Sequence, residues 1–506
     1  METILPELLQ DEILSFLDAK FLIRVCLLVS KKWKDLVEHQ VPTRLVFRMY
    51  SNGYAFPIQI DREFKFQNME LLSNSFPLKN IRRITVETIS NGQLEVLTRF
   101  SQMEHLKVRS FLMTPEEVEE NTSLMVTLFN RLKKLELKWM TCDWKATRVF
   151  NSKLLSIIST GCKQLTYLRL HSLDGECTKL MVESGLFEKL EGLTLDDYIF
   201  TNSDIEVLSS IGEGAKLKVL NLGNVNRNTE ANVAHSLFTC ASFCNLEKLS
   251  IKSVTNDYVK SIATSSVLWN LESLILTSFS FGDGISYDGI EALCQSRLRL
   301  YHLELSFSSL NDQAFTLMSQ CGDFISCIKE LVLNRIKASD GFEGMKMFMS
   351  CPYTSQLQQL IFSVENARGG DEIFKVVTEN MINLERLEFD CKIGDVGVQH
   401  LSCAKLEKLR YLSLKRNYNI TSVGWKFLAS CSTLPSLKTL DIRDNKSQSD
   451  ESSNIIKSNP VFSDLEIIRY TSERDLKQSE FMMSFSSSSL FGSTGKTEGF
   501  TFGFSK

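Results

Sequence analysis

The sequence predicts an α/β solenoid, in which short parallel strands line the concave side and helices lie outside, behind a small all-helical amino-terminal module. Three observations support this fold class: a recurring six-residue apolar pattern, the even spacing of its copies, and helix-start signals between the copies. The chain of 506 residues, 43% hydrophobic and 23% charged, is long enough for such an array. This composition excludes a disordered or collagen-like protein.

The recurring fragment has the form L-x-x-L-x-L, as in LKKLEL from Leu132, LTYLRL from Leu165 and LERLEF from Leu384. Weaker copies occur at the amino-terminal end and a frayed one at the carboxyl end. From Ile81 to Leu437, thirteen steps between copies cover 356 residues, and each step is 22 to 33 residues long. Chance matches would be scattered more widely. Each copy therefore predicts a short strand whose leucines face the interior of a repeat.

The segments between these fragments carry the chemistry of helix starts. TNSDIEVLSSI and ITSVGWKFLASC, for example, place a polar residue before apolar residues at helical spacing. The candidate capping residues are Asp204, Asp288, Asp312, Asp395 and Thr421. Because one repeat cannot bury its own apolar face, the copies must stack into a curved solenoid.

The repeats resemble the cysteine-containing leucine-rich repeats of F-box proteins. That pattern has Asn or Cys eight residues after the first Leu, where the side chain hydrogen-bonds the neighbouring coil. Only Asn417 and Asn445 occupy this place, and Cys391 is one residue short. The middle repeats have other residues there: Tyr198, Val225, Val254 and Phe279. We therefore expect a broken polar ladder and irregular turns in the middle of the array.

Residues 4–36, ILPELLQDEILSFLDAKFLIRVCLLVSKKWKDL, resemble the F-box. The matching places are Leu5-Pro6, Ile13-Leu14, Phe16-Leu17, Leu22, Val29-Ser30-Lys31-Lys32 and Trp33. Two features depart from the family pattern: Ala19 stands where Pro is commoner, and one extra residue lies between Leu22 and Val29. Apart from the resemblance, Pro6 suits the first turn of a helix, and the aliphatic residues after it form an apolar face.

A module of this size has more apolar helix surface than it can bury in itself, which implies a partner. In the family, that partner is a Skp-type adaptor, which bridges to a cullin scaffold and a RING subunit. The resemblance assigns seven residues to the shared apolar layer, some facing the adaptor and some facing the module's own core. They are Leu5, Pro6, Ile13, Leu14, Leu17, Leu22 and Trp33.

The sequence divides into four parts. We expect the F-box at residues 1–45, a connector at 46–78, the leucine-rich-repeat solenoid at 79–470 and a disordered tail at 471–506. From Phe481 onward, the tail has six Phe, seven Ser and four Gly in 26 residues, a composition typical of disorder. Asp444 to Ser458, rich in Ser, Asn and Asp, predicts an exposed loop that interrupts the last repeats.

Several kinds of chemistry have no support in the sequence. The six histidines lie at least 64 residues apart and no Cys-x-x-Cys occurs, so we expect no metal site. No nucleophile-elbow or catalytic-cysteine context occurs, so we also expect no catalytic residue and no cofactor. With 57 Lys and Arg against 61 Asp and Glu, there is no overall basic excess that would indicate a nucleic-acid partner.

The cysteines and the amino terminus bear on where the protein is found. Thirteen scattered cysteines do not form a closed disulfide framework, and we expect most of them to be reduced core residues of the repeats. The amino terminus lacks the basic start and smooth apolar stretch of a signal peptide, and no apolar run approaches the length of a membrane span. We therefore expect a cytoplasmic or nuclear protein that does not bind membranes.

The resemblance implies that the chain is the substrate-recognition subunit of an SCF-type E3 ubiquitin ligase. The F-box would bind the adaptor, the repeats would bind the target, and the chain itself would be non-catalytic. Target contacts are expected on the concave strands, beside the inward leucines. Our candidates combine an apolar middle with charged residues: Arg169, His171, Lys248, Lys252, Ile275, Val332, Ile361, Arg386, Glu388, Lys415 and Arg443.

Two other functions fit the same sequence. The chain could be a leucine-rich-repeat scaffold that binds proteins without a ligase, in which case it would form no adaptor complex. It could also be an F-box protein that serves assembly or localisation without causing degradation. Nothing in the sequence identifies the target protein.

Overall fold

The computed structural model describes residues 43–47, 81–111, 113–139, 144–171, 175–212, 214–226, 230–278, 284–337, 342–365, 369–445 and 449–469. The chain divides into two compact units, residues 1–339 and 340–506. In each unit, parallel strands form one layer, and helices cover one face of that layer. The predicted α/β solenoid with parallel strands is therefore confirmed.

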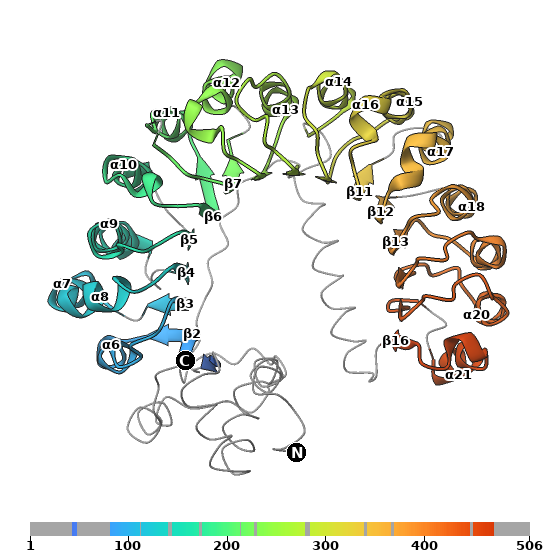
Figure 1. Cartoon of the computed structure of the whole chain (residues 1–506), viewed down its shortest axis with the longest axis horizontal. Helices are drawn as coiled ribbons and strands as arrows, with labels where there is room; N and C mark the ends of the chain where they lie inside the picture. Colours follow the sequence, from blue (N-terminus) through green and yellow to red (C-terminus); the bar gives the residue numbers. More distant parts are fainter. Residues whose placement is uncertain are drawn as a thin grey trace, which may run out of the picture. The chain divides into compact units, whose positions relative to one another are not determined.

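In the first unit, each strand pairs in parallel with the next strand along the chain. These strands lie on the concave side of this unit (Figure 1). They are β1 (Thr43–Phe47), β2 (Ile81–Ile89), β3 (His105–Phe111), β4 (Lys134–Trp139), β5 (Tyr167–His171), β6 (Gly192–Phe200), β7 (Val219–Val225), β8 (Lys248–Lys252), β9 (Ser273–Thr277), β10 (His302–Ser306) and β11 (Glu330–Lys337). With β1, the sheet begins earlier in the chain than the expected start of the repeats at residue 79.

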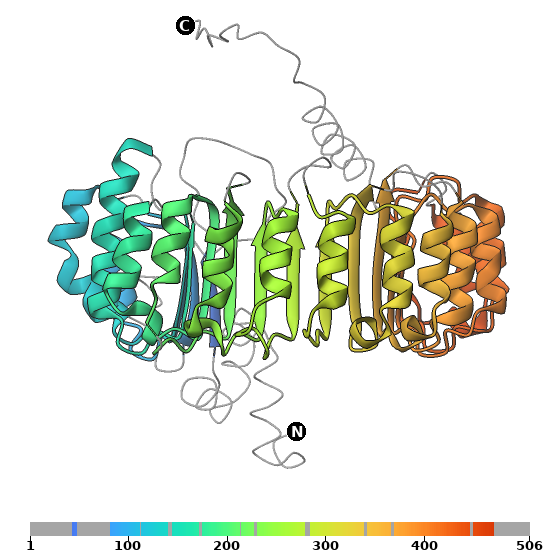
Figure 2. The same cartoon turned by 90° about the horizontal axis from the view of Figure 1, so that it is seen from above.

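The helices of the first unit lie side by side on its convex side (Figure 2). They are α6 (Asn91–Thr98), α7 (Pro115–Glu120), α8 (Thr122–Phe129), α9 (Trp144–Gly161), α10 (Gly175–Glu183), α11 (Asn202–Ser209), α12 (Ala231–Thr239), α13 (Asn256–Ala263), α14 (Tyr287–Gln295), α15 (Asp312–Gln320) and α16 (Gly322–Ile325), with 3₁₀ helices η3 (Leu186–Glu188) and η4 (Ala241–Phe243). A strand and the helix that follows it form one coil of the solenoid. Because consecutive helices pack on one another, each coil buries its apolar surface against the neighbouring coils.

The second unit repeats this arrangement. Its strands are β12 (Gln359–Glu365), β13 (Arg386–Asp390), β14 (Tyr411–Ser413), β15 (Thr439–Asp441) and β16 (Glu466–Ile468). Its helices are α17 (Glu343–Ser350), α18 (Gly370–Asn380), α19 (Asp395–Gln399), α20 (Ser422–Ala429) and α21 (Asp450–Lys457), with 3₁₀ helices η5 (Pro352–Gln356), η6 (His400–Cys403) and η7 (Pro460–Phe462). All described strand pairs of this unit are parallel.

The core consists of the apolar residues of the L-x-x-L-x-L fragments together with the buried faces of the helices. In β13, Leu387 and Phe389 are buried, whereas the alternate residues Arg386, Glu388 and Asp390 are partly exposed. This alternation follows from the period of two along a strand. It sends every second side chain to the face of the sheet that the helices do not cover.

The asparagine that bonds the neighbouring coil is present at the carboxyl end, whereas two described coils in the middle have buried Val225 and Val254 at its place, as expected. Asn417 is buried; its amide donates to the carbonyl oxygens of Phe389 (2.7 Å) and Leu414 (3.0 Å), and its Oδ1 accepts from the Ile393 N–H (2.9 Å). Apolar Val225 is buried at the corresponding place of an earlier coil. There the register shifts between β6 and β7 and again between β7 and β8. Replacement of the asparagine does not by itself cause a shift, because β8, whose coil has Val254 at the same place, pairs with β9 in an unbroken register.

Helix capping differs from the expectation in two respects: the N-caps of α14 and α15 are Ser286 and Asn311 rather than Asp288 and Asp312, and one of the expected carboxylates caps a neighbouring helix. Thr421 is the N-cap of α20, as expected, and accepts from the Val423 N–H. Asp395, however, caps the next helix rather than its own, because its Oδ1 accepts from the N–H groups of Thr421 (2.7 Å) and Gly424 (2.9 Å). In the same way, Asp371 of α18 caps the start of α19. Carboxylates at helix starts therefore hold neighbouring coils together.

The prediction of an exposed loop from Asp444 to Ser458 is wrong, because this stretch contains α21. Ser449 is its N-cap and accepts from the Ser452 N–H at 3.1 Å, and Ile456 is fully buried. The high content of Ser and Asp marks the capped start and the solvent-facing side of a short helix. Too few apolar residues are present for helical periodicity to be visible in the sequence.

We expect Gly397→Ala to lower the free energy of unfolding by about 1–2 kcal/mol. A Cβ at residue 397 would lie 2.4 Å from Oδ1 of Asp371, the atom that accepts from the N–H groups of Gly394 (2.7 Å) and Gly397 (3.0 Å). Urea unfolding followed by circular dichroism measures the change. Gly92→Ala in α6 is the matched control, because no atom lies within 4 Å of its Cβ position. That variant should be neutral or slightly stabilising, and equal losses in both variants would contradict the capping role of Asp371.

Candidate functional site

The strand faces are the parts of both units at which alternate side chains point away from the core. In the first unit, the register of β2 to β8 places these residues in rows that cross the sheet. We call the charged group in these rows the basic face. It consists of Arg83, His105, Lys107, Arg109, Lys134, Glu136, Lys138, Arg169, His171, Asp196, Lys248 and Lys252.

Glu136 of β4 lies at the centre of one cluster on the basic face. Its carboxylate oxygens lie 3.0 Å from Lys134 Nζ, 3.1 Å from His105 Nε2 and 3.4 Å from Lys107 Nζ. These partners come from β3 and β4, which the ladder pairing holds side by side. Glu136 is only 7% exposed. The carboxylate is therefore buried beneath cationic groups.

The pKa of Glu136 reflects two opposing effects. Burial by itself would raise the pKa, because a charged carboxylate loses its hydration. Hydrogen bonds from His105 and Lys134, together with the charges of Lys134 and Lys107, outweigh this effect and hold the pKa of Glu136 well below its usual range. The carboxylate is thus ionised at neutral pH and stabilises the cations around it.

A second cluster surrounds Asp196 of β6. Oδ2 of Asp196 lies 2.7 Å from the Arg169 guanidinium and 3.3 Å from His171 Nε2, and Oδ1 lies 3.5 Å from Lys252 Nζ. Asp196 is only 4% exposed. The structure therefore brings together Arg169 and His171, two of the residues that the sequence placed on the target-binding surface, around a buried acid that sequence analysis did not single out.

The expected apolar middle is interrupted in the first unit. Ile275 and Val332 lie in the same row, but Glu304 of β10 lies between them in the ladder. Val332 is also only 6% exposed and so offers little of its side chain to a partner. His302 and Glu330 form an ion pair at 2.9 Å in the adjacent row. This end of the strand face is therefore mixed in character rather than apolar.

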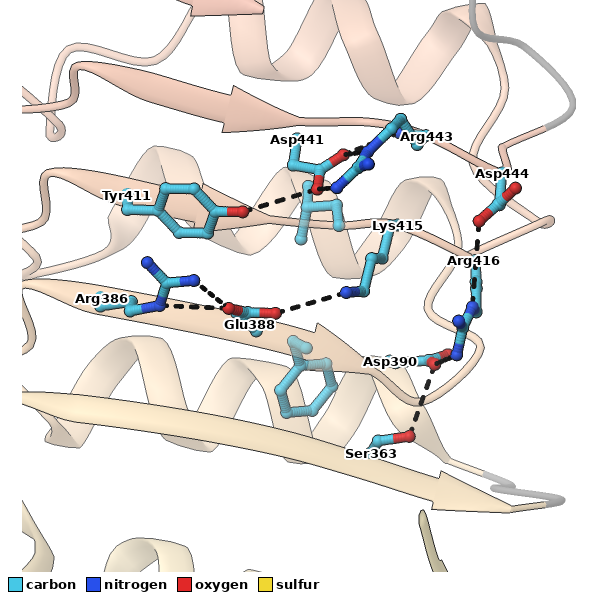
Figure 3. A network of polar contacts seen from close by, with 12 residues as sticks. Ser363, Arg386, Glu388, Asp390, Tyr411, Lys415, Arg416, Asp441, Arg443 and Asp444 are labelled. Carbon is cyan, nitrogen blue, oxygen red and sulfur yellow. Dashed lines mark hydrogen bonds and ion pairs between the residues drawn. The ribbon is translucent and has the colours of Figure 1, made fainter. Parts of the chain in front are cut away.

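The strand face of the second unit is a network of ion pairs (Figure 3). Arg386 pairs with Glu388, and Lys415 Nζ lies 3.5 Å from the same carboxylate. The Arg386 guanidinium also lies over the ring of Tyr411, 4.0 Å from its centroid. These contacts cross from β13 to β14 and its following turn, so side-chain charge reinforces the backbone ladder.

Asp441 and Arg443 form the other part of this network. Asp441 is fully buried, and its two oxygens accept from Arg443 Nε (3.0 Å) and from the guanidinium NH2 group (2.7 Å). The Tyr411 hydroxyl donates to the same carboxylate at 3.5 Å. Burial, together with the charges of Asp441 and Glu388, raises the pKa of Tyr411. Arg443 was expected to contact a target. In the structure, its guanidinium pairs with the buried carboxylate of Asp441.

At the end of these strands, Arg416 lies between two carboxylates. It is 3.5 Å from Asp390 and 3.9 Å from Asp444, and Ser363 donates to Asp390 at 3.4 Å. Burial raises the pKa of Asp390 despite the opposing charge of Arg416. Arg416 itself has a positive φ of 64°, which is uncommon for a residue other than glycine. The turn with positive φ and the two ion pairs therefore involve the same residue, Arg416.

The predicted contact residues of the second unit thus lie together. Arg386, Lys415 and Arg443 belong to the network, and Ile361 lies beside Glu388 in the ladder. Their cations face carboxylates at close range. These residues were expected on the strand face, whereas Lys107, Lys134 and Lys138 of the first unit were not among the expected contact residues. Alternation in HLKVRS and KLELKW was the signal that could have found them.

Other kinds of site have little support among the described residues. These residues contain no group of three or more His, Cys, Asp or Glu that could hold a metal ion, and no helix among them is long and apolar enough to cross a membrane. The described cysteines are free thiols, several of them buried. Burial raises the pKa of Cys162 to about 12, which keeps it a protonated core residue.

Comparison with known proteins identifies the amino-terminal module. Residues 3–45 match the family model of the F-box domain. The chain therefore carries an F-box domain. The residues assigned to adaptor binding all fall within this match, but they lie outside the residues whose structure is described: Leu5, Pro6, Ile13, Leu14, Leu17, Leu22 and Trp33. The expected tail at 471–506 also lies outside them.

Comparison of the whole chain with known proteins gives no curated sequence match and low structural similarity. Among solved structures, the chain is similar to one in the crystal structure of the Rad7 and Elc1 complex in yeast, with 15% identity, a TM-score of 0.38, and coverage of 91% of this chain and 90% of that chain. A leucine-rich-repeat protein of Leptospira interrogans has 17% identity and a TM-score of 0.34, with coverage of 78% and 91%. Both scores are too low to support a conclusion about this chain.

The depressed pKa of Glu136 predicts a specific pH dependence. A carboxylate whose pKa is lowered by folding stabilises the fold above its unfolded pKa, about 4.5, and that stabilisation is lost as the pH falls below it. We expect Glu136→Gln to lower the free energy of unfolding at pH 7 and to flatten its decline at acidic pH, in urea titrations from neutral pH down to about pH 3. Glu206→Gln, at an exposed position of α11, is the control and should keep the wild-type pH profile. The assignment fails if Glu136→Gln keeps that profile as well.

The buried pair of Asp441 and Arg443 predicts a loss of stability. Arg443→Ala leaves the fully buried Asp441 without its guanidinium partner, which should cost about 3 kcal/mol in urea unfolding. Arg410→Ala removes a largely exposed arginine 3.9 Å from Glu385, and we expect it to cost well under 1 kcal/mol. Adding Asp441→Asn to Arg443→Ala should recover part of the loss. A loss no larger than that of Arg410→Ala would show that Arg443 has no such structural role.

Proposed function

We propose that this chain, which joins an F-box domain to leucine-rich repeats, is the substrate-recognition subunit of an SCF-type E3 ubiquitin ligase. The F-box would bind a Skp-type adaptor and through it a cullin and RING core, in the cytoplasm or the nucleus. The repeats would bind the target protein. The F-box match at residues 3–45 is the observation that carries this proposal.

The repeats supply what a receptor requires. In the first unit, the helices cover one side of the sheet, and the strand face opposite them presents exposed charged side chains. Such a face is built on hydrogen-bonded strands, so its side chains hold a defined spacing. A binding surface on a rigid support loses little entropy when a partner binds.

The contribution of the chain to ubiquitin transfer would be proximity. Binding the adaptor at one end and the target at the other makes the encounter between target and ligase core intramolecular, which raises the effective concentration. The chemical step belongs to the ligase core. The chain would therefore act as a non-catalytic receptor.

Co-purification tests the adaptor contact. Leu5→Ala combined with Pro6→Ala should abolish recovery of a Skp-type adaptor and a cullin with the full-length chain, because both residues fall at the start of the F-box match. The control is Val396→Ala combined with Val423→Ala, which truncates two exposed side chains of the second unit and should leave recovery unchanged. If the wild-type chain recovers no adaptor, or the F-box variant recovers as much, the chain is a scaffold outside the ligase.

Degradation needs a separate measurement. Proteins bound through the repeats should accumulate when the proteasome is inhibited, and should accumulate equally when the F-box variant replaces the wild-type chain. Bound proteins whose levels respond to neither change would identify a receptor that serves assembly or localisation instead.

A further inference from the structure

We infer that the basic face binds an acidic segment of the target protein, with a run of carboxylates or phosphates lying across β2 to β8. This inference rests on the proposed function, because it names the chemistry of the target. It concerns only the first unit. The strand face of this unit has an imbalance of charge that is not visible in the composition of the whole chain.

The basic face carries many more cations than anions. Among its described side chains are eight lysines and arginines, two histidines and two acids. The lysines and arginines are Arg83, Lys107, Arg109, Lys134, Lys138, Arg169, Lys248 and Lys252. The whole chain, by contrast, has a formal net charge of −4. With the histidines counted as neutral, the eight cations and two acids of this face leave a formal excess of six positive charges, opposite in sign to the charge of the chain.

Burial separates the two signs of charge on this face. Glu136 and Asp196 are 7% and 4% exposed, whereas the side chains of Lys107, Arg169 and Lys252 are 38% to 45% exposed. Each acid has two lysine or arginine partners and one histidine. Even if the histidines are counted as neutral, each cluster therefore has an excess of one positive charge. Because the acid is buried, the exposed side chains that a partner can contact are cationic.

Further cations on this face add to the excess. Arg83, Lys138 and Lys248 are exposed and form no ion pair with another described side chain. The second unit differs, because each cation of its network lies within 4 Å of a carboxylate: Arg386 and Lys415 face Glu388, and Arg443 faces Asp441. Among the described residues, the strand face of the first unit therefore has three exposed cations without a carboxylate partner, whereas each cation of the network in the second unit has one.

The spacing of these cations suits an extended peptide. Arg83 of β2 and Lys248 of β8 lie in one row, separated by six strand steps. At about 4.8 Å a step, the row spans roughly 29 Å, which an extended segment of about nine residues covers. Lys138 and the Glu136 cluster lie between these ends, and the Asp196 cluster reaches from β5 to Lys252 of β8, so acidic groups along one segment would meet cations in succession.

The aromatic content of this face favours a protein over a nucleic acid. Single-stranded nucleic acids are bound by cationic grooves that also offer aromatic rings for base stacking. Tyr167 is engaged on this face: Lys134 Nζ lies 4.2 Å from its ring centroid, its hydroxyl bonds Thr194 at 2.9 Å, and the ring packs against Gly192. The ring is therefore used in packing and is not available as a platform for a base.

Fluorescence anisotropy with the full-length chain tests the inference. The probes are labelled nine-residue peptides of alternating Glu and Ser, the same peptide with phosphorylated serines, and a Gln-for-Glu counterpart. We expect the acidic peptide to bind, the phosphorylated peptide to bind more tightly, the Gln peptide not to bind, and affinity to fall as salt rises from about 50 to 200 mM.

Charge-reversal variants locate the site. Lys138→Glu combined with Lys248→Glu should weaken binding by about tenfold or more. The matched control is Lys163→Glu combined with Lys216→Glu, which makes the same charge change at exposed lysines in loops before β5 and β7, and it should leave affinity within about twofold of wild type. Circular dichroism verifies that both variants fold.

Three results would overturn the inference. They are no binding of either acidic peptide by the wild-type chain, equal loss in the two charge-reversal variants, and tighter binding of a single-stranded oligonucleotide of equal charge that the Lys138 and Lys248 changes abolish. The F-box variant should still bind the peptide, and the Lys138 and Lys248 variant should still recover the adaptor. Failure of this inference is thus distinguishable from failure of the proposed function.

Discussion

The structure depends on the burial of strand leucines between stacked coils. Leu387 and Phe389 are buried because neighbouring coils cover them, and so are the corresponding residues of most described repeats, whereas Ile467 in the last strand is partly exposed. No coil could bury these side chains alone. The strand alternation that buries them also presents the remaining side chains on one open face, so the interaction surface is a direct consequence of the core.

Polar contacts between neighbouring coils also hold the stack together. Asp371 and Asp395 each cap the helix of the following coil, and the glycines at residues 397 and 424 leave room for these carboxylates. Asn417 bonds the turn of the preceding coil. Val225 and Val254 stand at the asparagine place in two other coils; both are buried, and the register shifts beside Val225 but not between β8 and β9. Packing therefore sets the fold, and the polar bonds add contacts between neighbouring coils.

The two strand faces use charge differently. The second unit surrounds its buried acids with matched cations, so its network contributes mainly to stability. The first unit buries Glu136 and Asp196 beneath a larger number of exposed cations, which leaves a positive surface. This positive surface is the basis of our proposal that the first unit binds an acidic partner. In the proposed receptor, the F-box domain of the same chain would bind the ligase core.

The sequence alone determined the F-box, the strands and most helices, because Leu-Pro and L-x-x-L-x-L are local patterns with periods that strands and helices impose. It also placed Arg169 and Arg386 on the strand face. It missed α21, whose signal is a cap with little apolar periodicity. Only the tertiary structure decided which charges are neutralised. The partners of Lys107 and Arg443, and the next-helix cap of Asp395, depend on which side chains stacking brings together and buries, and local sequence does not contain that information.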